Sequence, residues 1–317
     1  MNTVQKSILE RGYATVESSI DTETRQSLLS LGNEVIDLAL RENSIREALT
    51  YSPFPSIPGK DVCGFFVDEP RVAKDDSISF HSGWQSAEIA RSKLGDKMPQ
   101  VLVDFFEVQQ TVLRATVDQW SLFLDSLLPA KESSELKGLL FHTDTNLNNH
   151  HIRIVRYNDV LENPPKEVFS THGDLSVLTT ELAESIDRVN NMAPYPLELV
   201  SDSVDIERYR KSIAIKDNAS PIDYNPETEV VTFLGFAAAY VRSIRNSDQF
   251  KQLRAGFHYG KFNTTQPKMP KGYQFGNHRL AAIAFAHPHY EVPYTEYRSA
   301  TTEACRPEQV FEKQTKN

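Results

Sequence analysis

The sequence has little cysteine, no long apolar run and no concentration of positive charge. Only two of its 317 residues are cysteines, Cys63 and Cys305, and they lie far apart. Such a pair provides neither a disulfide framework nor a thiolate metal site. No run of about eighteen apolar residues occurs, and the N-terminus lacks an apolar stretch of signal-peptide length. We therefore predict a cytoplasmic protein that does not cross a membrane.

The charges are mostly acidic and scattered along the chain. Asp and Glu number 43 against 34 Lys and Arg, which gives a net charge of −9 at pH 7. Because nucleic acids and anionic membranes need a concentrated basic surface, we predict that neither is a partner. The 39% hydrophobic and 24% charged residues are typical of a globular protein with a sizeable core. Nothing in the sequence indicates an oligomeric state.

Helical periodicity dominates the N-terminal part of the chain. The segment "DTETRQSLLSLGNEVIDLALRE" begins with Asp21, a candidate N-cap, and then repeats apolar residues at three-and-four spacing. A second, longer periodic pattern over 98–128 ends before Pro129. Both patterns predict helices. Residues 43–97 are rich in Pro, Ser and Asp, so we predict loops there, with one short strand in "DVCGFFVDEPRV".

Beyond residue 148 the pattern changes to short β-rich runs. These runs are "HIRIVRYN", "LSVLTTEL", "EVVTFLG", "AGFHYGKF" and "HRLAAIAFAHP", separated by Pro, Asn, Asp and Gly. They indicate an antiparallel sandwich or barrel. We predict an α+β protein with a mainly β core, divided into a mostly helical part (1–147) that packs on the core, a catalytic core (148–300) and a polar tail (301–317).

Three His-x-Asp/Glu motifs are candidates for a metal site: "HTD" at His142, "HGD" at His172 and "HYE" at His289. Non-haem Fe(II) sites use two histidines and one carboxylate, with positions left open for other ligands. In extended backbone, residues two apart lie on the same side, so His172 and Asp174 suit one ion. "HGD" also precedes a β-like run. The third ligand should be a distant histidine on a neighbouring strand, and His258 in "AGFHYG" is our candidate.

The order of these segments resembles that of the 2-oxoglutarate- and Fe(II)-dependent oxygenases of the isopenicillin N synthase-like family. The strand "IRIVRYN" ends in a tyrosine, "HGDLSVLTT" follows, and "EVVTFLGFAAAYVRSIRNSDQFKQLRAGFHYG" leads to the distal histidine. "HRLAAIAFAHP" is similar to the family's last core strand. The likeness spans most of residues 10–295 and is specific after residue 148. It implies a double-stranded β-helix (jelly-roll) flanked by N-terminal helices, with iron at His172, Asp174 and His258.

The resemblance also settles our choice among the three motifs. "HTD" precedes the tyrosine strand and lies among asparagines that favour turns, so we interpret it as a surface loop. "HYE" follows the last core strand, which is too late for the same role.

The same resemblance implies a co-substrate site. Arginine suits the distal carboxylate of 2-oxoglutarate because its planar fork donates two parallel hydrogen bonds, and Arg279 matches the family's arginine. The family usually has a serine two residues later, where this chain has Ala281. Tyr157 is the candidate replacement donor. Arg153 and Arg156 stay open as alternative cations.

The implied activity is oxidation, by default hydroxylation, of a C–H bond in a small molecule such as an amino-acid-derived or other secondary metabolite. Iron(II) would be the cofactor, and O₂ and 2-oxoglutarate would be consumed, with release of succinate and CO₂. Two alternatives stay open: an iron oxidase of the isopenicillin N synthase type that uses no 2-oxoglutarate, and a non-catalytic ligand-binding barrel.

Two segments have an open interpretation. Residues 181–229 are longer than the fold requires, and they form either a lid or a passive insertion. The aromatic residues Phe65, Phe66, Phe80 and Trp84 either cover the substrate or pack against the long helix that begins near Met98.

Overall fold

The structure is a computed structural model that describes residues 2–51, 63–67, 77–157, 167–172, 174, 176–188, 191–193, 197–203, 220–222, 224–225, 227–235, 256–262, 279–289 and 291. Its helices are α1 (Thr3–Arg11), α2 (Thr22–Arg41), α3 (Asn43–Leu49), α4 (Ser86–Leu94), α5 (Gln100–Leu127) and α6 (Ala130–Leu140), with short 3₁₀ turns η1 (Gly95–Lys97) and η2 (Thr145–Leu147). Its strands are β1 (Tyr13–Glu17), β2 (Gly64–Val67), β3 (Ser77–Gly83), β4 (His150–Tyr157), β5 (Glu167–His172), β6 (Leu178–Arg188), β7 (Asn191–Ala193), β8 (Leu197–Ser203), β9 (Ser220–Pro221), β10 (Glu229–Leu234), β11 (Gly256–Phe262) and β12 (Arg279–Ala286).

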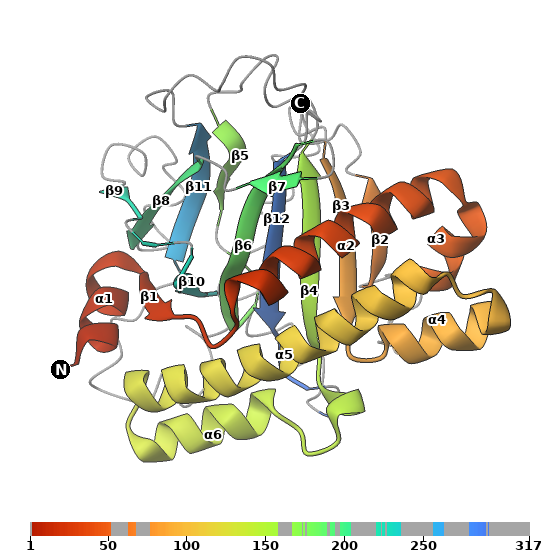
Figure 1. The fold of residues 1–317 in the computed structure, drawn as a ribbon. Coiled ribbons are helices and arrows are strands. Elements are labelled where there is room, and N and C mark those ends of the chain that lie inside the picture. Colours follow the sequence, from red (N-terminus) through yellow and green to blue (C-terminus); the bar gives the residue numbers. More distant parts are fainter. Residues whose placement is uncertain are drawn as a thin grey trace, which may run out of the picture.

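The strands form two antiparallel sheets (Figure 1). The larger sheet has the order β1-β10-β6-β12-β4-β3-β2, with β7 beside β6, and the smaller has the order β5-β11-β8-β9. From β4 onward the chain passes repeatedly between the two sheets, so strands that are neighbours in space are distant in sequence. This confirms a mainly β core with helices. Strands β1, β2 and β3 from the first 147 residues share a sheet with later strands, and the domain division stays a prediction.

One face of the larger sheet, the outer face, is covered by α2 and α5, which run across it in Figure 1. Each helix presents an apolar stripe to the sheet, and the stripes join the outer-face side chains in one hydrophobic core. The predicted start of α2 is confirmed, because the Asp21 carboxylate accepts a hydrogen bond from the Thr24 N–H at 2.7 Å. The long helix is confirmed too, since α5 ends at Leu127, ahead of Pro129. No helix in the described ranges has the length and apolarity needed to span a membrane.

The opposite face, the inner face, is turned toward the smaller sheet. Ile222, next to β9, packs with Val231 and Phe233 of β10 in a second hydrophobic cluster. The strand register then assigns every residue of β12 and β4 to one face or the other: Phe285 pairs with His151, and Ile283 pairs with Arg153, on the inner face. Residues between them in sequence lie on the outer face, because successive residues of a strand alternate.

The prediction of loops over residues 43–97 was wrong in part, because that region contains α3, β3 and α4 in addition to the predicted short strand β2. Helices α1 and α6 were also not predicted. The 7 residues of α3 and 9 of α4 are too few to show a clear period, and α4 buries the small residues Ser86, Ala87 and Ala90. Strand β3 buries serines at Ser77, Ser79 and Ser82, which hides its apolar alternation.

Candidate active site

The smaller sheet brings two of the predicted metal ligands to one register position. Strand β5 ends at His172 and runs antiparallel to β11, where His258 is its direct partner. Residues paired in this way have Cβ atoms about 4.5–5.5 Å apart on one face of the sheet. The motif was expected ahead of a strand, and β6 does follow it, beginning at Leu178, while His172 itself is the last residue of β5. The backbone of His172 and His258 is described and their side chains are not, so metal ligation stays a prediction.

Hydrogen bonds on the C-terminal side of Asp174 fix the path of the chain. The Val177 N–H donates to the Ala286 carbonyl at 2.8 Å, and the Gly235 N–H donates to the Val177 carbonyl at 3.0 Å. A Cβ atom on Gly235 would collide with the Ser176 carbonyl oxygen and would also lie close to the backbone oxygen of Asp174. Glycine at the end of β10 therefore lets the Asp174 segment lie directly against the larger sheet.

This path places Asp174 near the end of β12. Burial lowers the pKa of His287, which follows β12, to about 4, and the Asp174 carboxylate acts on that pKa in the opposite direction. A carboxylate acts on the pKa of a histidine in this way when the two side chains lie near each other. The predicted iron carboxylate thus lies beside the inner face of the larger sheet.

A row of aromatic rings that sequence reasoning missed crosses the inner face at this place. The His151 ring of β4 stacks with His81 of β3 at 5.2 Å, with Phe285 of β12 at 5.1 Å and with His287 at 5.3 Å between ring centroids. The His151 and His287 planes are 5° apart. We call His81, His151, Phe285 and His287 the ring row. No local sequence signal could have identified it, because its members come from three strands and only the register joins them.

The histidines of the ring row are held in their neutral form. Burial is the main cause that lowers the pKa of both His81 and His151 well below the ordinary value, and the nearby charge of Arg153 acts in the same direction. His150 is the next residue to His151 but lies on the outer face, where its ring makes edge contacts with Trp120 and Phe141. Burial there lowers the pKa of His150 to about 3.

The candidate cations for the co-substrate separate onto the two faces. Arg279 and Tyr157 are register partners between β12 and β4, so these two positions are neighbours, although their side chains lie outside the described part. Arg153 lies on the inner face, opposite Ile283. Arg156 is excluded as a co-substrate cation, because it lies on the outer face and its guanidinium donates to the Asp37 carboxylate of α2 at 2.6 Å. Arg153 and Arg156 lie on opposite faces because successive side chains of a strand alternate between its two faces.

Part of the inner face keeps solvent-accessible surface. Five residues around the ring row are only partly buried: His81, Arg153, Ile283, Phe285 and His287. Outer-face residues of the same strands, such as Ile152, Ile154 and Ala284, have none of their surface exposed. The accessible patch of the inner face therefore lies next to Asp174, and among the described side chains it combines two histidines and two apolar residues with Arg153.

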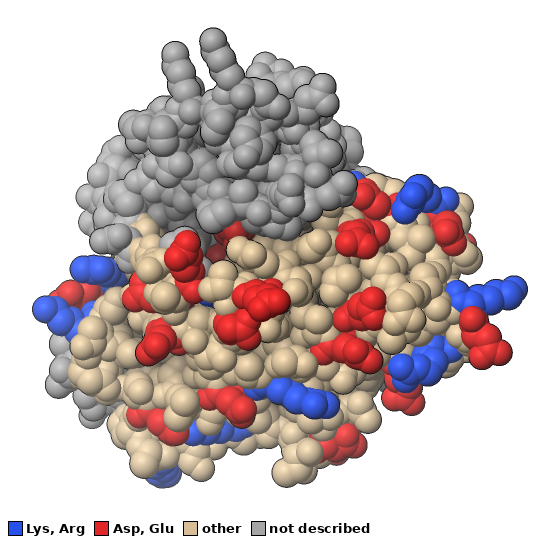
Figure 2. Space-filling model, in the orientation of Figure 1, with Lys and Arg blue, Asp and Glu red and all other residues tan. Residues whose placement is uncertain are grey.

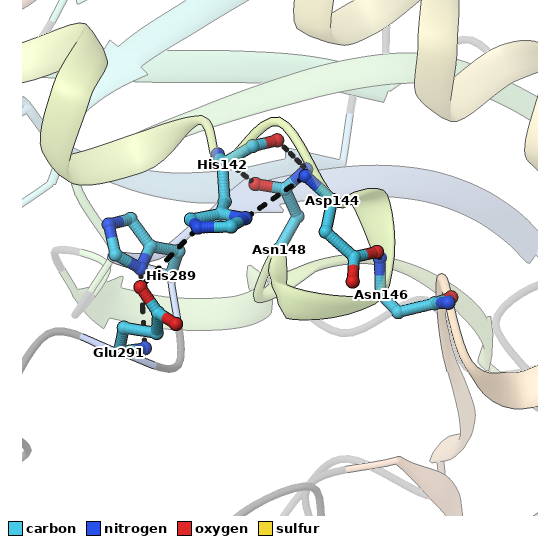
Figure 3. A network of polar contacts seen from close by, with 6 residues as sticks. All are labelled: His142, Asp144, Asn146, Asn148, His289 and Glu291. Carbon is cyan, nitrogen blue, oxygen red and sulfur yellow. Dashed lines mark hydrogen bonds and ion pairs between the residues drawn. The ribbon is translucent and has the colours of Figure 1, made fainter.

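The rival "HTD" motif forms a surface network with the "HYE" motif (Figure 3). His142 Nδ1 accepts a hydrogen bond from the Asp144 N–H at 3.0 Å, and its Nε2 lies 3.3 Å from a Glu291 carboxylate oxygen. The Asn148 side chain accepts from the His142 N–H at 2.6 Å, and the His289 ring lies 5.2 Å from the His142 ring. Both nitrogens of His142 are thus engaged within the network. The prediction of a loop here is confirmed.

Of the two interpretations left open for the aromatic segment, packing in the core holds for Phe80 and Trp84. Phe80 has no exposed surface, and its ring lies 5.0 Å from Phe65 and 5.3 Å from Phe105 of α5. Trp84 is 7% exposed, and its indole N–H donates to His150 Nδ1 at 3.4 Å. The covering role is therefore wrong for Phe80 and Trp84, since they pack under α5. The Phe66 side chain lies outside the described part of the structure.

Much of the presumed insertion 181–229 is regular sheet. It contains most of β6, the short strands β7 and β9, and β8, which pairs with β11 along its whole length. These strands therefore do not form a lid, because they are part of the two sheets. Residues 204–219 lie outside the described residues.

The described surface and side chains add two facts. On the face that carries α2 and α5, Lys and Arg are interspersed with Asp and Glu (Figure 2). Among the side chains that the structure describes, no three His, Cys, Asp or Glu groups are placed to hold a metal ion. Two of the three predicted ligands are outside that set.

No family model and no curated protein matches the sequence. Solved structures do match. A candidate oxygenase from Shewanella oneidensis is similar with a TM-score of 0.57, over 98% of this chain and 94% of that one, at 14% identity. A candidate 2OG-Fe(II) oxygenase family protein from Caulobacter crescentus gives 0.56, over 90% and 80% of the two chains, at 14% identity.

A third similar structure is the dioxygenase for auxin oxidation 1 from Arabidopsis thaliana, in a binary complex with 2-oxoglutarate. Its TM-score is 0.52, over 90% of this chain and 86% of that one, at 15% identity. At such identities the likeness establishes the fold alone. The chain has the fold of the 2-oxoglutarate- and Fe(II)-dependent oxygenases.

Proposed function

We propose that the chain is a non-haem Fe(II)- and 2-oxoglutarate-dependent dioxygenase whose core is a double-stranded β-helix, or jelly roll. The passage of the chain between two antiparallel sheets supports this core. Because one fold serves many functions, the activity has to be argued from the site. The observation that carries it is the register pairing of His172 with His258, with Asp174 two residues after the first.

The proposed metal ligands are His172, Asp174 and His258. Two imidazoles and one carboxylate are the donor set that suits Fe(II) and leaves coordination positions open. The pairing of β5 with β11 supports this set, since it makes neighbours of two histidines that are distant in sequence. Gly235 supports it as well, because it lets the Asp174 segment lie close to the sheet. When bound, iron supplies activation of O₂ coupled to decarboxylation of 2-oxoglutarate to succinate and CO₂.

The protein's own part in this chemistry is to bind and orient the reactants. We assign the distal carboxylate of 2-oxoglutarate to Arg279, whose planar fork matches a carboxylate. Tyr157 is the register partner of Arg279, which suits it to donate the hydrogen bond that Ala281 lacks. The substrate is a small organic molecule, such as an amino-acid-derived or other secondary metabolite, and hydroxylation is the proposed outcome.

Succinate formation tests the proposal without knowledge of the substrate. Purified protein with Fe(II), ascorbate, O₂ and 2-oxoglutarate should release succinate slowly in the uncoupled reaction. His258→Ala should abolish this release and weaken Mn(II) binding measured by calorimetry, because one of three ligands is lost. The matched control His142→Ala, in the surface network, should keep both.

Three results would contradict the proposal. Full succinate release by His258→Ala would exclude that histidine as a ligand. O₂ consumption without succinate would instead favour an oxidase that uses no 2-oxoglutarate, and no Fe(II)-dependent O₂ consumption with any candidate substrate would favour a binding barrel.

A further inference from the structure

We propose that the pair His142 and His289 forms an acid-sensitive latch, which holds the chain after β12 against the end of α6 at neutral pH and releases it in acid. The pair joins two segments that are far apart in the sequence, the turn after α6 and the chain after β12 (Figure 3). This inference goes beyond the proposed function and does not depend on it, because neither the latch nor its test involves iron, co-substrate or activity.

The two histidines make the same kind of backbone contact. Nδ1 of His142 accepts a hydrogen bond from the Asp144 N–H at 3.0 Å, and Nδ1 of His289 accepts one from the Glu291 N–H at 3.2 Å. Each imidazole thus bonds to the backbone two residues further on, as the side chain of an Asx-turn does. A ring nitrogen that accepts a hydrogen bond carries no proton, so both rings are neutral in this arrangement, with their proton on Nε2.

Further contacts hold the two segments together. The His289 N–H donates to the Leu139 carbonyl in the last turn of α6 at 3.0 Å. Nε2 of His142 lies 3.3 Å from a Glu291 carboxylate oxygen, and the centroids of the two imidazole rings are 5.2 Å apart. The backbone contacts of His289 and Glu291 therefore set the position of the chain after β12 on α6.

Protonation of His289 is incompatible with the closed latch. Because Nε2 already carries a proton, a second proton has to bind at Nδ1, where the Glu291 N–H points. Two donors would then face each other, and the hydrogen bond would break. Burial is the main cause that lowers the pKa of His289 below the ordinary histidine value, and a charge on His142 acts in the same direction. The closed latch therefore selects the neutral ring.

Other groups around the pair act in both directions. The titratable and charged groups that face it are Glu291 on the chain after β12, His142 and Asp144 in the turn after α6, and His150 of β4. The Glu291 carboxylate and the Gly138 carbonyl of α6 favour a proton on His289. Glu291 is 61% exposed, so water screens its attraction, and burial with the Nδ1 contact decides the sign.

The pH dependence follows from the lowered pKa. The released chain takes up a proton on His289 near pH 6.5, whereas the closed latch takes it up only at lower pH. The latch is therefore stable above about pH 6.5 and weakens as the pH falls below that value. One histidine that is neutral only in the closed form should shift the closing equilibrium by about tenfold between pH 7.5 and 5.5.

Hydrogen–deuterium exchange of backbone amides in the full-length protein measures the opening. After correction for the intrinsic pH dependence of exchange, protection of the His289 and Glu291 amides should fall by about tenfold between pH 7.5 and 5.5. Amides in the middle of α5 report global unfolding and should stay better protected over the same range. Their comparison with the two latch amides separates local release from acid unfolding of the whole protein.

Substitutions at His289 separate the titration from the contact. The side-chain oxygen of His289→Asn can accept the Glu291 N–H in an ordinary Asx-turn, but it does not titrate. Protection of the Glu291 amide in this variant should therefore be independent of pH over the same range. The matched control, His289→Phe, keeps a flat ring beside His142 and cannot accept the hydrogen bond, so it should lower the protection already at pH 7.5.

An ion pair between protonated His142 and Glu291 predicts the opposite sign, because acid would then raise the protection of the Glu291 amide. Rising or unchanged protection in the unchanged protein would overturn the proposal, and so would an equal fall in His289→Asn. Glu291→Gln keeps the backbone N–H and removes the carboxylate, so it should keep the fall in acid. A loss of the pH dependence in Glu291→Gln would assign it to the carboxylate and would also overturn the latch.

Discussion

The two faces of strands β4 and β12 differ although the same two segments of the chain build both. On the outer face, Ile152, Ile154 and Ala284 have no exposed surface and belong to the core under α2 and α5. On the inner face, Arg153 and Phe285 stay partly exposed. Because residues alternate along a strand, one segment supplies core and candidate site at the same time. The face on which a residue lies decides which of the two it serves.

The outer face is packed tightly enough to restrict the helix above it. Gly32 of α2 lies so close to the sheet that an added Cβ would be 2.8 Å from a side-chain carbon of Ile154. Interiors of this density respond to the loss or gain of single methyl groups. The inner face, with its accessible patch, should tolerate substitution better. The predictions below test this difference.

The largest difference is expected between two phenylalanines. Phe80→Ala removes a fully buried ring from between Phe65 and Phe105, and it should lower the free energy of unfolding by about 3–5 kcal/mol. Phe285→Ala, on the partly exposed inner face, should cost clearly less, because part of that ring already contacts solvent. Urea unfolding of both variants measures the difference. Equal losses would mean that the two faces are packed alike.

Two glycines provide the next comparison. Gly235→Ala forces a Cβ atom against the Ser176 carbonyl, so we expect a loss of about 1–3 kcal/mol in thermal or urea unfolding. If Asp174 binds the metal, the same shift should also weaken Mn(II) binding. The control is Gly138→Ala in the last turn of α6, where an added Cβ meets nothing within 4 Å. It should stabilise the protein by about 0.5–1 kcal/mol, because alanine favours helix. A harmless Gly235→Ala would show that this close approach does not fix the Asp174 segment.

Long regular elements could be predicted from the sequence, and short ones could not. The 20 residues of α2 and 28 of α5 repeat their apolar stripe over many helical turns. By contrast, α4 buries Ala87 and Ala90, which carry little pattern, and β3 buries serines. Tertiary contacts stabilise these short elements, and contacts between distant segments are not visible in a local window.

The candidate site shows the same limit. The His172 and Asp174 motif is local and could be found in the sequence, and the segment order suggested His258. The sequence left Arg153 and Arg156 as equivalent alternatives, because the face of each depends on the register of β4. The ring row could not be predicted at all, since it joins three strands. Register is set by pairing across the whole sheet, so it is the part of the site that one sequence does not disclose.

Acid should destabilise the protein, because its buried histidines are neutral in the folded state. The contribution of one of them, His150 on the outer face, can be measured separately. Its folded-state pKa of about 3 lies below the ordinary histidine pKa of 6.5. Between these values the unfolded chain binds a proton that the folded chain does not, so stability is present above about pH 6.5 and falls as the pH decreases toward 3. The slope is about 1.4 kcal/mol per pH unit.

The variant His150→Leu replaces the imidazole with an apolar side chain and so removes this titration. Urea unfolding between pH 4 and 6 should therefore show a pH slope smaller by about 1.4 kcal/mol per unit than that of the unchanged protein. Its stability at pH 7.5 is expected to be lower, because the Trp84 indole N–H loses its acceptor. An unchanged slope would mean that His150 is not held neutral in the folded protein.

The smallest effect is expected for Arg156→Gln, which also sharpens the contrast with Arg153. The Arg156 side chain is 6% exposed and its Asp37 partner is 51% exposed, with a further contact to the Asn33 amide oxygen at 3.2 Å. Water around Asp37 weakens the ion pair, so the loss should be about 1 kcal/mol, well below that of a fully buried pair. A double-mutant cycle with Asp37→Asn measures the pair directly and should give a coupling of about 0.5–1 kcal/mol. A stability loss at Arg156→Gln without loss of succinate formation would match an outer-face role, whereas a raised requirement for 2-oxoglutarate would return Arg156 to the candidate site.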